Sequence, residues 1–285
     1  MLINPNSGLK NSKNHLLDVI DIFSKEGYEI SAYTTQRHGD AYNYLLENAY
    51  KYDVVCVFGG DGTMNEVTNA LMKLDNQPML GYFPSGTMND FGSNFDLGND
   101  FVSIAKRICR RNIKEFDVGQ YNDSYFNYVT AFGAMCDVSY TTPRDSKEVL
   151  GNIAYLVEGI SKLPEIKPNH VKYTINNQTY DSDILFGLIY SGNRVAGMTL
   201  EDNRHSHIDD GMFNVLMVDY VPTILNKPDV ISTLMNRDNY IHIFHTDYVH
   251  LEMDRDIAFT LDGEKADNTG SADIRIFKKA LRMLI

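Results

Sequence analysis

The residues best suited to chemistry form a Gly-Gly-Asp-Gly-Thr run at positions 59–63, between an apolar stretch at 54–58 and a helical pattern beginning near Met64. Glycines let the backbone turn tightly and approach a ligand without a Cβ in the way. The N–H groups at the start of the following helix attract phosphate. Asp61 and Thr63 can cap that helix or contact a ligand. The run therefore suits a phosphate-binding site.

A plain structural turn is the alternative interpretation of this run. Asp-Gly is a common turn dipeptide, and Asp or Thr is a common helix N-cap. The run is not a Walker A loop, because no Gly-Lys-Ser/Thr follows it. The spacing alone leaves both interpretations open.

Two further polar segments that contain glycine favour the phosphate site. Residues 4–8 (Asn-Pro-Asn-Ser-Gly) follow the first expected strand, and residues 84–91 (Pro-Ser-Gly-Thr-Met-Asn-Asp-Phe) follow the fourth. Loops after parallel strands gather at the carboxyl edge of the sheet, where ligands bind. Three such loops at one edge predict a shared nucleotide or phosphate site.

The elements that position these loops alternate between strands and helices. Strands are expected at residues 1–4, 28–34, 54–58 and 79–83, and helices at 16–23, 41–50, 64–74 and 101–111. Such alternation is typical of an α/β layer with a largely parallel sheet.

After about residue 117 the pattern changes to strands separated by Asn, Asp or Gly turns, such as Asn176-Asn177. Strands are expected at residues 125–132, 171–175, 184–190, 213–218, 240–244, 248–253 and 257–261, and helices only at 147–163 and 223–235. Runs of strands after an α/β half predict a second, β-rich antiparallel domain.

Composition limits the classes of function. The chain has 26 Lys+Arg against 38 Asp+Glu, a net charge of −12, which argues against nucleic acid as a general partner. Its three cysteines are far apart, which fits a reducing compartment and excludes a disulfide framework or a cysteine zinc site. Neither a signal peptide nor a transmembrane segment is expected, so a cytoplasmic protein is predicted.

The three polar segments, in this order and spacing, resemble the diacylglycerol kinase catalytic-domain family, and in particular its soluble bacterial lipid-kinase branch. Later landmarks extend the resemblance over nearly the whole chain: Asn127 with Gly133, Ser191-Gly192-Asn193, Asp209-Asp210-Gly211 and Leu261-Asp262-Gly263-Glu264. Each motif alone is weak, but the ordered set is specific.

The resemblance implies a three-layer α/β nucleotide-binding domain over residues 1–118 and a β-sandwich-like lipid-substrate domain over residues 119–285. It leaves room for the extreme C-terminus to pack back on the first domain. It also implies a set of ATP-binding residues: Asn4, Thr35, Gly59, Gly60, Asp61, Gly62, Thr63, Met64, Asn65, Glu66, Gly86, Thr87, Asn89 and Asp90.

The catalytic residues implied by the resemblance are Asp262 and Glu264, one of which acts as general base on the lipid hydroxyl while both face the γ-phosphate. Without the resemblance, Asp262-Gly263 would be interpreted as a hairpin turn. The implied Mg²⁺ site uses Asp210 with the backbone carbonyls of His207 and Met212. Oxygen ligands suit Mg²⁺, although Asp209-Asp210-Gly211 alone is a turn pattern.

A basic helical segment has two interpretations. Its charges lie at Lys106, Arg107, Arg110, Arg111 and Lys114. A solvated helix face is the simpler one, and contact with anionic lipid is the alternative.

The sequence therefore predicts an ATP- and Mg²⁺-dependent lipid kinase, most simply one that converts diacylglycerol to phosphatidic acid. The alternatives are an NAD kinase, which shares the Gly-Gly-Asp-Gly-Thr loop, and a nucleotide-binding regulatory protein with little turnover. The expected partner is a lipid at a membrane surface that the protein contacts transiently. The sequence leaves open whether the chain forms a homodimer.

Overall fold

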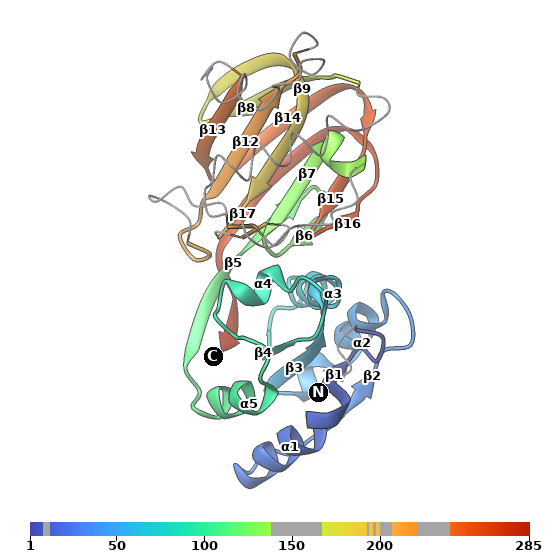
Figure 1. Ribbon diagram of the computed structural model, residues 1–285, viewed down its shortest axis with the longest axis vertical. Helices are drawn as coiled ribbons and strands as arrows, with labels where there is room; N and C mark the ends of the chain where they lie inside the picture. Colours follow the sequence, from blue (N-terminus) through green and yellow to red (C-terminus); the bar gives the residue numbers. More distant parts are fainter. Residues whose placement is uncertain (8–11, 138–166, 193, 196–197, 200–206, 222–239) are drawn as a thin grey trace. The chain divides into compact units, whose positions relative to one another are not determined.

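The computed structural model describes residues 1–7, 12–137, 167–192, 194–195, 198–199, 207–221 and 240–285 (Figure 1). The predicted helices at 147–163 and 223–235 lie outside the described residues, as do Gly8 and Asn193. Two compact units are present: unit 1 contains Met1–Val118 and Lys278–Ile285, and unit 2 contains Gly119–Phe277. The chain crosses between them within β5 (Ile113–Tyr121) and within β17 (Thr269–Leu284).

Unit 1 is built on a parallel sheet in the order β2-β1-β3-β4-β17. Its N-terminal strands are β1 (Leu2–Ile3), β2 (Tyr33–Thr34), β3 (Val54–Gly59) and β4 (Met79–Pro84), and the end of β17 lies beside β4. Apolar residues fill β3 and β4, as expected for strands covered on both faces. The predicted α/β class with a parallel sheet is confirmed.

Helices cover this sheet in pairs, α1 with α5 and α2 with α3. The helical segments of unit 1 are α1 (Ser12–Lys25), α2 (Asp40–Asn48), η1 (Ala49–Lys51), α3 (Asp61–Leu71), α4 (Asp90–Ser93) and α5 (Phe101–Cys109). The chain passes from β1 through α1 to β2, at one edge of the sheet. It then returns through α2 to β3 and continues through α3 to β4, on the opposite side of β1. Because such crossovers are right-handed, the reversal assigns α1 and the α2/α3 pair to opposite faces. The reversal creates a switch point between the ends of β1 and β3, where α/β sheets bind ligands.

Unit 2 is an antiparallel β structure whose strands enclose one apolar core. Its segments are β6 (Ser124–Phe126), β7 (Val129–Gly133), η2 (Ala134–Asp137), β8 (Asn169–Ile175), β9 (Gln178–Tyr190), β10 (Arg194–Val195), β11 (Met198–Thr199), β12 (Phe213–Asp219), β13 (Ile241–Thr246), β14 (Tyr248–Ile257), β15 (Phe259–Leu261) and β16 (Glu264–Lys265).

The long strand β9 joins two layers of this unit. Its first half pairs with β8, which continues to β14 and β17, and its second half pairs with β7 and β12, which continue to β15, β16 and β13. Inward side chains from both groups, including Tyr173, Leu251 and Ile274 on one and Phe132 and Phe259 on the other, form the core. This arrangement confirms the predicted sandwich-like class.

Several element boundaries differ from the sequence expectation. The strand expected at 28–34 is reduced to β2, and the one expected at 125–132 is split into β6 and β7. Strands β5 and β17 were not expected, because their alternating Lys, Glu, Asp and Arg residues hide the apolar period. The Asn176-Asn177 turn is as predicted, since both residues have positive φ between β8 and β9.

The expected basic face is largely tied to neighbouring groups of unit 1. The Arg107 guanidinium donates hydrogen bonds to the carbonyls of Phe95 and Asp96, and the Lys114 ammonium lies 5.3 Å from the Phe95 ring centroid. The Arg111 guanidinium stands 5.7 Å from the Tyr28 ring centroid. Three of the five predicted residues thus contact groups of unit 1, whereas Lys106 and Arg110 are exposed, as the solvated face predicts. Within the described residues no helix is long and apolar enough to cross a membrane.

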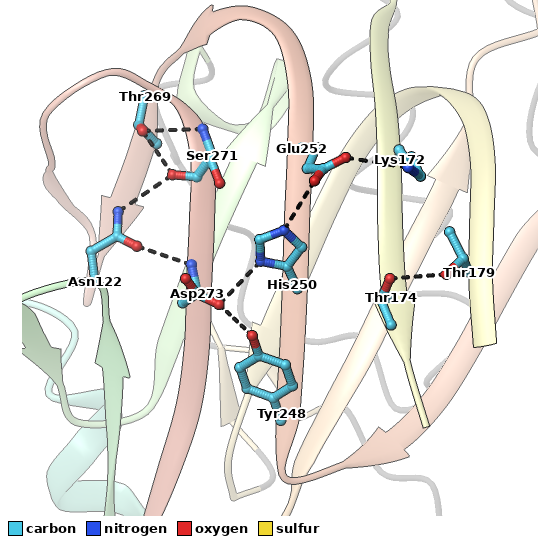
Figure 2. Close-up of polar contacts among 10 residues, drawn as sticks. All are labelled: Asn122, Lys172, Thr174, Thr179, Tyr248, His250, Glu252, Thr269, Ser271 and Asp273. Atoms are coloured by element: carbon cyan, nitrogen blue, oxygen red, sulfur yellow. Dashed lines mark hydrogen bonds and ion pairs between the residues drawn. The ribbon is translucent and has the colours of Figure 1, made fainter. Parts of the chain in front are cut away.

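A polar hydrogen-bond network covers the outer side of β8, β14 and β17 (Figure 2). Asp273 accepts hydrogen bonds from the Tyr248 hydroxyl and from His250 Nδ1, the latter at 3.0 Å. Glu252 lies beside His250 Nε2 at 3.4 Å and beside the Lys172 ammonium at 3.5 Å. Two hydrogen bonds lower the pKa of Asp273, and the one from Tyr248 has a larger effect than the one from His250.

This network predicts a pH-dependent stability. Because its folded-state pKa is lowered, Asp273 stabilises the fold above its unfolded pKa of about 3.9, and the stabilisation is lost as pH falls through the folded pKa. Asp273→Asn should therefore lower the melting temperature at pH 7, and the difference from wild type should shrink toward pH 3. Thermal melts across this range, with exposed Asp247→Asn as the matched control, measure the effect. A difference that does not change with pH would contradict it.

Candidate active site

At the switch point of unit 1, a hydrogen bond links the loop after β1 to the start of α3. Asn4 follows β1, and its Nδ2 donates to Thr63 Oγ1 at 2.8 Å in the first turn of α3. The Asn4 backbone N–H donates to the Phe58 carbonyl at 2.8 Å. Thr35, which follows β2 and is buried, donates its N–H to the Ile3 carbonyl. The predicted residues Asn4, Thr35 and Thr63 are therefore placed along one sheet edge.

The third polar loop, after β4, joins the same edge. Ser85 has an exposed fraction of 0%, and its Oγ lies 2.7 Å from Ser7 Oγ of the first loop. Its backbone N–H donates to the Gly59 carbonyl at 2.9 Å. The three loops that the sequence predicted to share an edge are thus in direct contact.

Gly60 and Gly86 make the closest backbone approach in this cluster. A Cβ on Gly86 would lie 2.6 Å from Gly60 Cα, and a Cβ on Gly60 would lie 3.0 Å from Gly86 Cα. A Cβ on Gly59 would lie 2.5 Å from Thr63 Cβ. These glycines are required by close packing, and we call the backbone contact of Gly60 and Gly86 at the N-terminus of α3 the glycine cradle.

The start of α3 differs from the expectation. The helix begins at Asp61, so Asp61, Gly62 and Thr63 form its first turn, and the helix cap is Gly60 without a side-chain cap hydrogen bond. The capping of α3 by Asp61 or Thr63, which belonged to the alternative interpretation of the run as a plain turn, is therefore wrong. Asp61 instead accepts hydrogen bonds from the backbone N–H groups of Asp90 and Phe91, both at 3.2 Å. It caps the short helix α4 and fastens the third loop to the glycine run.

Glu66 makes a similar contact one turn later. Its Oε1 accepts the N–H of Gly39 at 2.8 Å, and its Oε2 accepts the N–H of Ala41 at 3.1 Å. These amides belong to the first turn of α2 and the residue before it, where a negative charge is favoured. The exposed His38 ring also lies 3.1 Å from Glu66 Oε1. Glu66 therefore binds the start of α2.

Other predicted residues of the cluster have local roles in unit 1. Asn89, with a positive φ of 56°, closes the third loop through hydrogen bonds with the Gly86 backbone at 2.8 and 2.9 Å. Asn65 accepts from Asn69 Nδ2, and Thr87 is exposed. The Met64 side chain is fully buried, so it belongs to the core.

In unit 2 the predicted pair Asp262 and Glu264 lies in the hairpin between β15 and β16. Asp262 and Gly263 both have positive φ, 51° and 86°, and form the two-residue turn that the simpler interpretation expected. Asp262 is nonetheless only 5% exposed, and its carboxylate accepts four hydrogen bonds from Asn127, Tyr128 and Val129. Glu264 is exposed. The hairpin holds one carboxylate inside and presents the other to solvent.

The predicted metal residues form a compact turn before β12. Asp210 Oδ1 accepts the Met212 N–H at 2.9 Å, and Oδ2 accepts the His207 N–H at 3.4 Å. Gly211 between them has a φ of 81°. The described residues hold no cluster of three His, Cys, Asp or Glu side chains suited to a metal, so only a site that uses backbone carbonyls fits here.

Three residues of these clusters were not singled out as site residues from the sequence. Ser7 and Ser85 link two loops through their hydroxyls, and Asn127 binds Asp262. All three lie inside motifs or landmarks that the sequence displays. Their role depends on a partner between 78 and 135 positions away, which no local pattern reports.

Comparison with known proteins gives consistent results. The profile of the diacylglycerol kinase catalytic domain matches residues 1–121. A diacylglycerol kinase of Staphylococcus haemolyticus is 35% identical over 245 residues, which are 85% of this chain and 72% of the relative. A diacylglycerol kinase of Bacillus subtilis is 32% identical over 276 residues, which are 93% of this chain and 88% of the relative.

Solved structures show the same fold. A Bacillus anthracis protein that carries a provisional diacylglycerol kinase name superposes with a TM-score of 0.80 at 26% identity, over 99% of this chain and 95% of that one. An NAD kinase of Archaeoglobus fulgidus in complex with ATP has a TM-score of 0.55 at 12% identity, over 100% and 92% of the two chains. The second likeness concerns the fold alone.

The glycine cradle predicts a graded effect of added methyl groups. Gly86→Ala should weaken binding of a nucleoside triphosphate by about tenfold, or roughly 1.4 kcal/mol, because the new Cβ would push two backbones apart. Gly60→Ala should weaken it less, since its Cβ has 0.4 Å more room (3.0 against 2.6 Å). Titration calorimetry measures both affinities.

Met88→Ala is the matched control, because Met88 lies in the same loop and is 41% exposed. It should leave the affinity within about twofold of wild type, well under 1.4 kcal/mol. Equal affinities for the Gly86 variant and wild type would show that the cradle does not bind the nucleotide.

Proposed function

This chain belongs to the diacylglycerol kinase catalytic-domain family and is a lipid kinase, and we propose that it transfers the γ-phosphate of ATP to the free hydroxyl of diacylglycerol. The observation that carries the proposal is the contact of three polar loops at the carboxyl edge of the unit 1 sheet. The identity of the acceptor lipid rests on relatives that are named for diacylglycerol.

The glycine cradle of unit 1 fits a phosphate chain. Its backbones touch at Gly60 and Gly86, so the surface there is lined by main-chain atoms that phosphate oxygens can approach closely. The first turn of α3 begins at this point, and helix N-termini favour anions. ATP, when bound, supplies the phosphoryl group. The chain's own contribution is to hold it in one position, which is most of what phosphoryl transfer requires.

Asp61 and Glu66 support this position indirectly. Each lends its charge to backbone N–H groups of a neighbouring helix start, α4 or α2, so their carboxylates are bound within the protein. A carboxylate bound to amide donors repels an incoming phosphate less than a free one. We infer that these two residues shape the site more than they touch the nucleotide.

Glu264 is the group we assign to receive the acceptor's proton. In the reaction the lipid oxygen bonds to the γ-phosphorus, the bond from that phosphorus to the β–γ bridging oxygen breaks, ADP leaves, and the hydroxyl proton passes to a carboxylate. An exposed carboxylate directly after a two-residue hairpin turn is accessible to such a hydroxyl. Phosphatidic acid would be the product.

The turn of His207, Asp210 and Met212 is our proposed Mg²⁺ site. A carboxylate with nearby backbone carbonyls is a hard oxygen donor set of the kind Mg²⁺ prefers. Asp210 already orders both backbone segments that would supply the carbonyls. A bound cation there would supply positive charge and further fix this turn.

The NAD kinase alternative rests on the shared fold of a distant neighbour, and the regulatory alternative on nucleotide binding alone. The relatives that match most of this chain carry the lipid kinase name. Three properties stay predictions from the sequence: a cytoplasmic location, transient contact with a membrane surface and a homodimer.

A substrate panel tests the activity. With radiolabelled ATP and Mg²⁺, label should appear in mixed micelles that contain diacylglycerol, and ceramide, a sphingoid base and NAD should be labelled more slowly. Labelled phosphatidic acid on thin-layer chromatography is the readout. Transfer to NAD but not to lipid would favour the NAD kinase alternative, and ATP binding without any transfer would favour the regulatory one.

The Mg²⁺ site predicts a ligand-dependent stability. At an Mg²⁺ concentration 100 times the dissociation constant, wild type should gain about 2.7 kcal/mol relative to EDTA. Asp210→Asn should lose most of that gain, because it removes the only charged ligand of the proposed set. Melts with and without Mg²⁺ measure the difference, which cancels any general loss of stability. Asp209→Asn, its neighbour, should keep the gain, and equal responses of the two variants would contradict the site.

A further inference from the structure

The carboxylate of Asp262 is buried and accepts four hydrogen bonds from one segment of unit 2. Its Oδ2 accepts the Asn127 N–H at 2.7 Å and Asn127 Nδ2 at 2.9 Å. Its Oδ1 accepts the N–H groups of Tyr128 at 3.0 Å and Val129 at 3.3 Å. A carboxylate has about four lone-pair sites, and here four donors are directed at them.

The donors come from one short segment, Asn127 and Tyr128 between β6 and β7 and Val129 at the start of β7. Three of them are successive backbone N–H groups, which form a concave anion site around the carboxylate. The Asp262 N–H in turn donates to the Val129 carbonyl at 2.8 Å. The hairpin turn and the β6–β7 connection are therefore joined by five hydrogen bonds.

This joint fixes the position of the Glu264 backbone. Leu261 pairs with Glu264 across the turn, so only Asp262 and Gly263 separate the two strands. Leu261 also pairs with Thr130 of β7, which extends the joint along the strand. A shift of Asp262 would be passed directly to Glu264.

We propose that Asp262 is a positioning residue, which holds the backbone of Glu264, the proposed proton acceptor, in place. This assignment rests on the proposed lipid kinase function, and it divides between two roles a carboxylate pair that the sequence left equivalent. Asp262 is buried and has four donors, so its charge stabilises the turn. Glu264 is exposed, so it is the carboxylate that meets the acceptor hydroxyl.

Asp262→Asn is an informative variant, because asparagine tolerates the positive φ of this position. In either amide orientation its NH₂ group would face two N–H donors, so the turn should shift. A displacement of about 1 Å costs about 10²-fold in rate. We expect kcat to fall by about that factor, while KM for ATP stays within about twofold.

Chemical rescue separates the two roles. Glu264→Ala should lose about 10² to 10⁴-fold in kcat, the range for a missing general base, and formate should restore at least part of it. Asp262→Ala should not respond to formate, because its defect is in geometry. Glu264→Gln should also flatten the acid limb of kcat/KM against pH, and Asp262→Asn should keep that limb. Exposed Asp267→Asn, in the same segment, is the matched control and should behave as wild type.

The opposite rescue, with Asp262→Ala restored by formate and Glu264→Ala not, would overturn the proposal. If the Asp262 variants do not fold, Asn127→Ala removes one donor and keeps the carboxylate, and it should lower kcat a few-fold with KM for ATP unchanged. Wild-type kcat in that variant would also overturn it. Absence of lipid phosphorylation by wild type would instead refute the proposed function, so the two failures are distinguishable.

Discussion

Backbone N–H groups at helix starts and in tight connections need acceptors, and in this protein carboxylates from distant segments provide them. Asp61 of α3 accepts the amides at the start of α4, and Glu66 accepts those at the start of α2. Asp262 accepts the three successive amides of Asn127, Tyr128 and Val129. Each contact satisfies donors that would be costly to leave unpaired. The clusters of both units share this kind of interaction.

In unit 1 the interaction bears on how an acidic protein would hold phosphate at the proposed site. The chain carries a net charge of −12, and two acidic residues lie in the motif that the resemblance assigns to nucleotide. Their charges are balanced by helix N-termini other than that of α3. The N-terminus of α3 and the touching backbones of Gly60 and Gly86 remain as the feature suited to an anion.

In unit 2 the same interaction gives unequal environments to two carboxylates of one hairpin. The turn at Asp262 and Gly263 requires positive φ at both positions, which brings the strands of Leu261 and Glu264 together. One acidic side chain is drawn into the amides of the neighbouring connection, and the other stays exposed. Elsewhere in this unit, on the outer side of β14 and β17, Asp273 has a structural role in a surface network (Figure 2).

The sequence by itself determined the classes of structure and the motifs. Apolar runs and loop positions predicted the parallel sheet and the meeting of three loops, because strand ends in such a sheet share an edge. It did not predict β17, whose polar residues alternate with its apolar ones and whose interruption at Lys279 has a positive φ of 51°. Nor did it predict that the carboxylate of Asp61 accepts the amides at the start of α4.

Only the tertiary structure decided what each acidic residue binds. Asp262 and Glu264 are equivalent in sequence, two carboxylates flanking one glycine. They differ once the chain brings Asn127 within 2.7 Å of Asp262, across 135 positions. The physical reason is that hydrogen bonds act over about 3 Å of space, whereas a sequence pattern reports only neighbours along the chain. The family and its chemistry could be inferred from local order, and the division of roles required the folded protein.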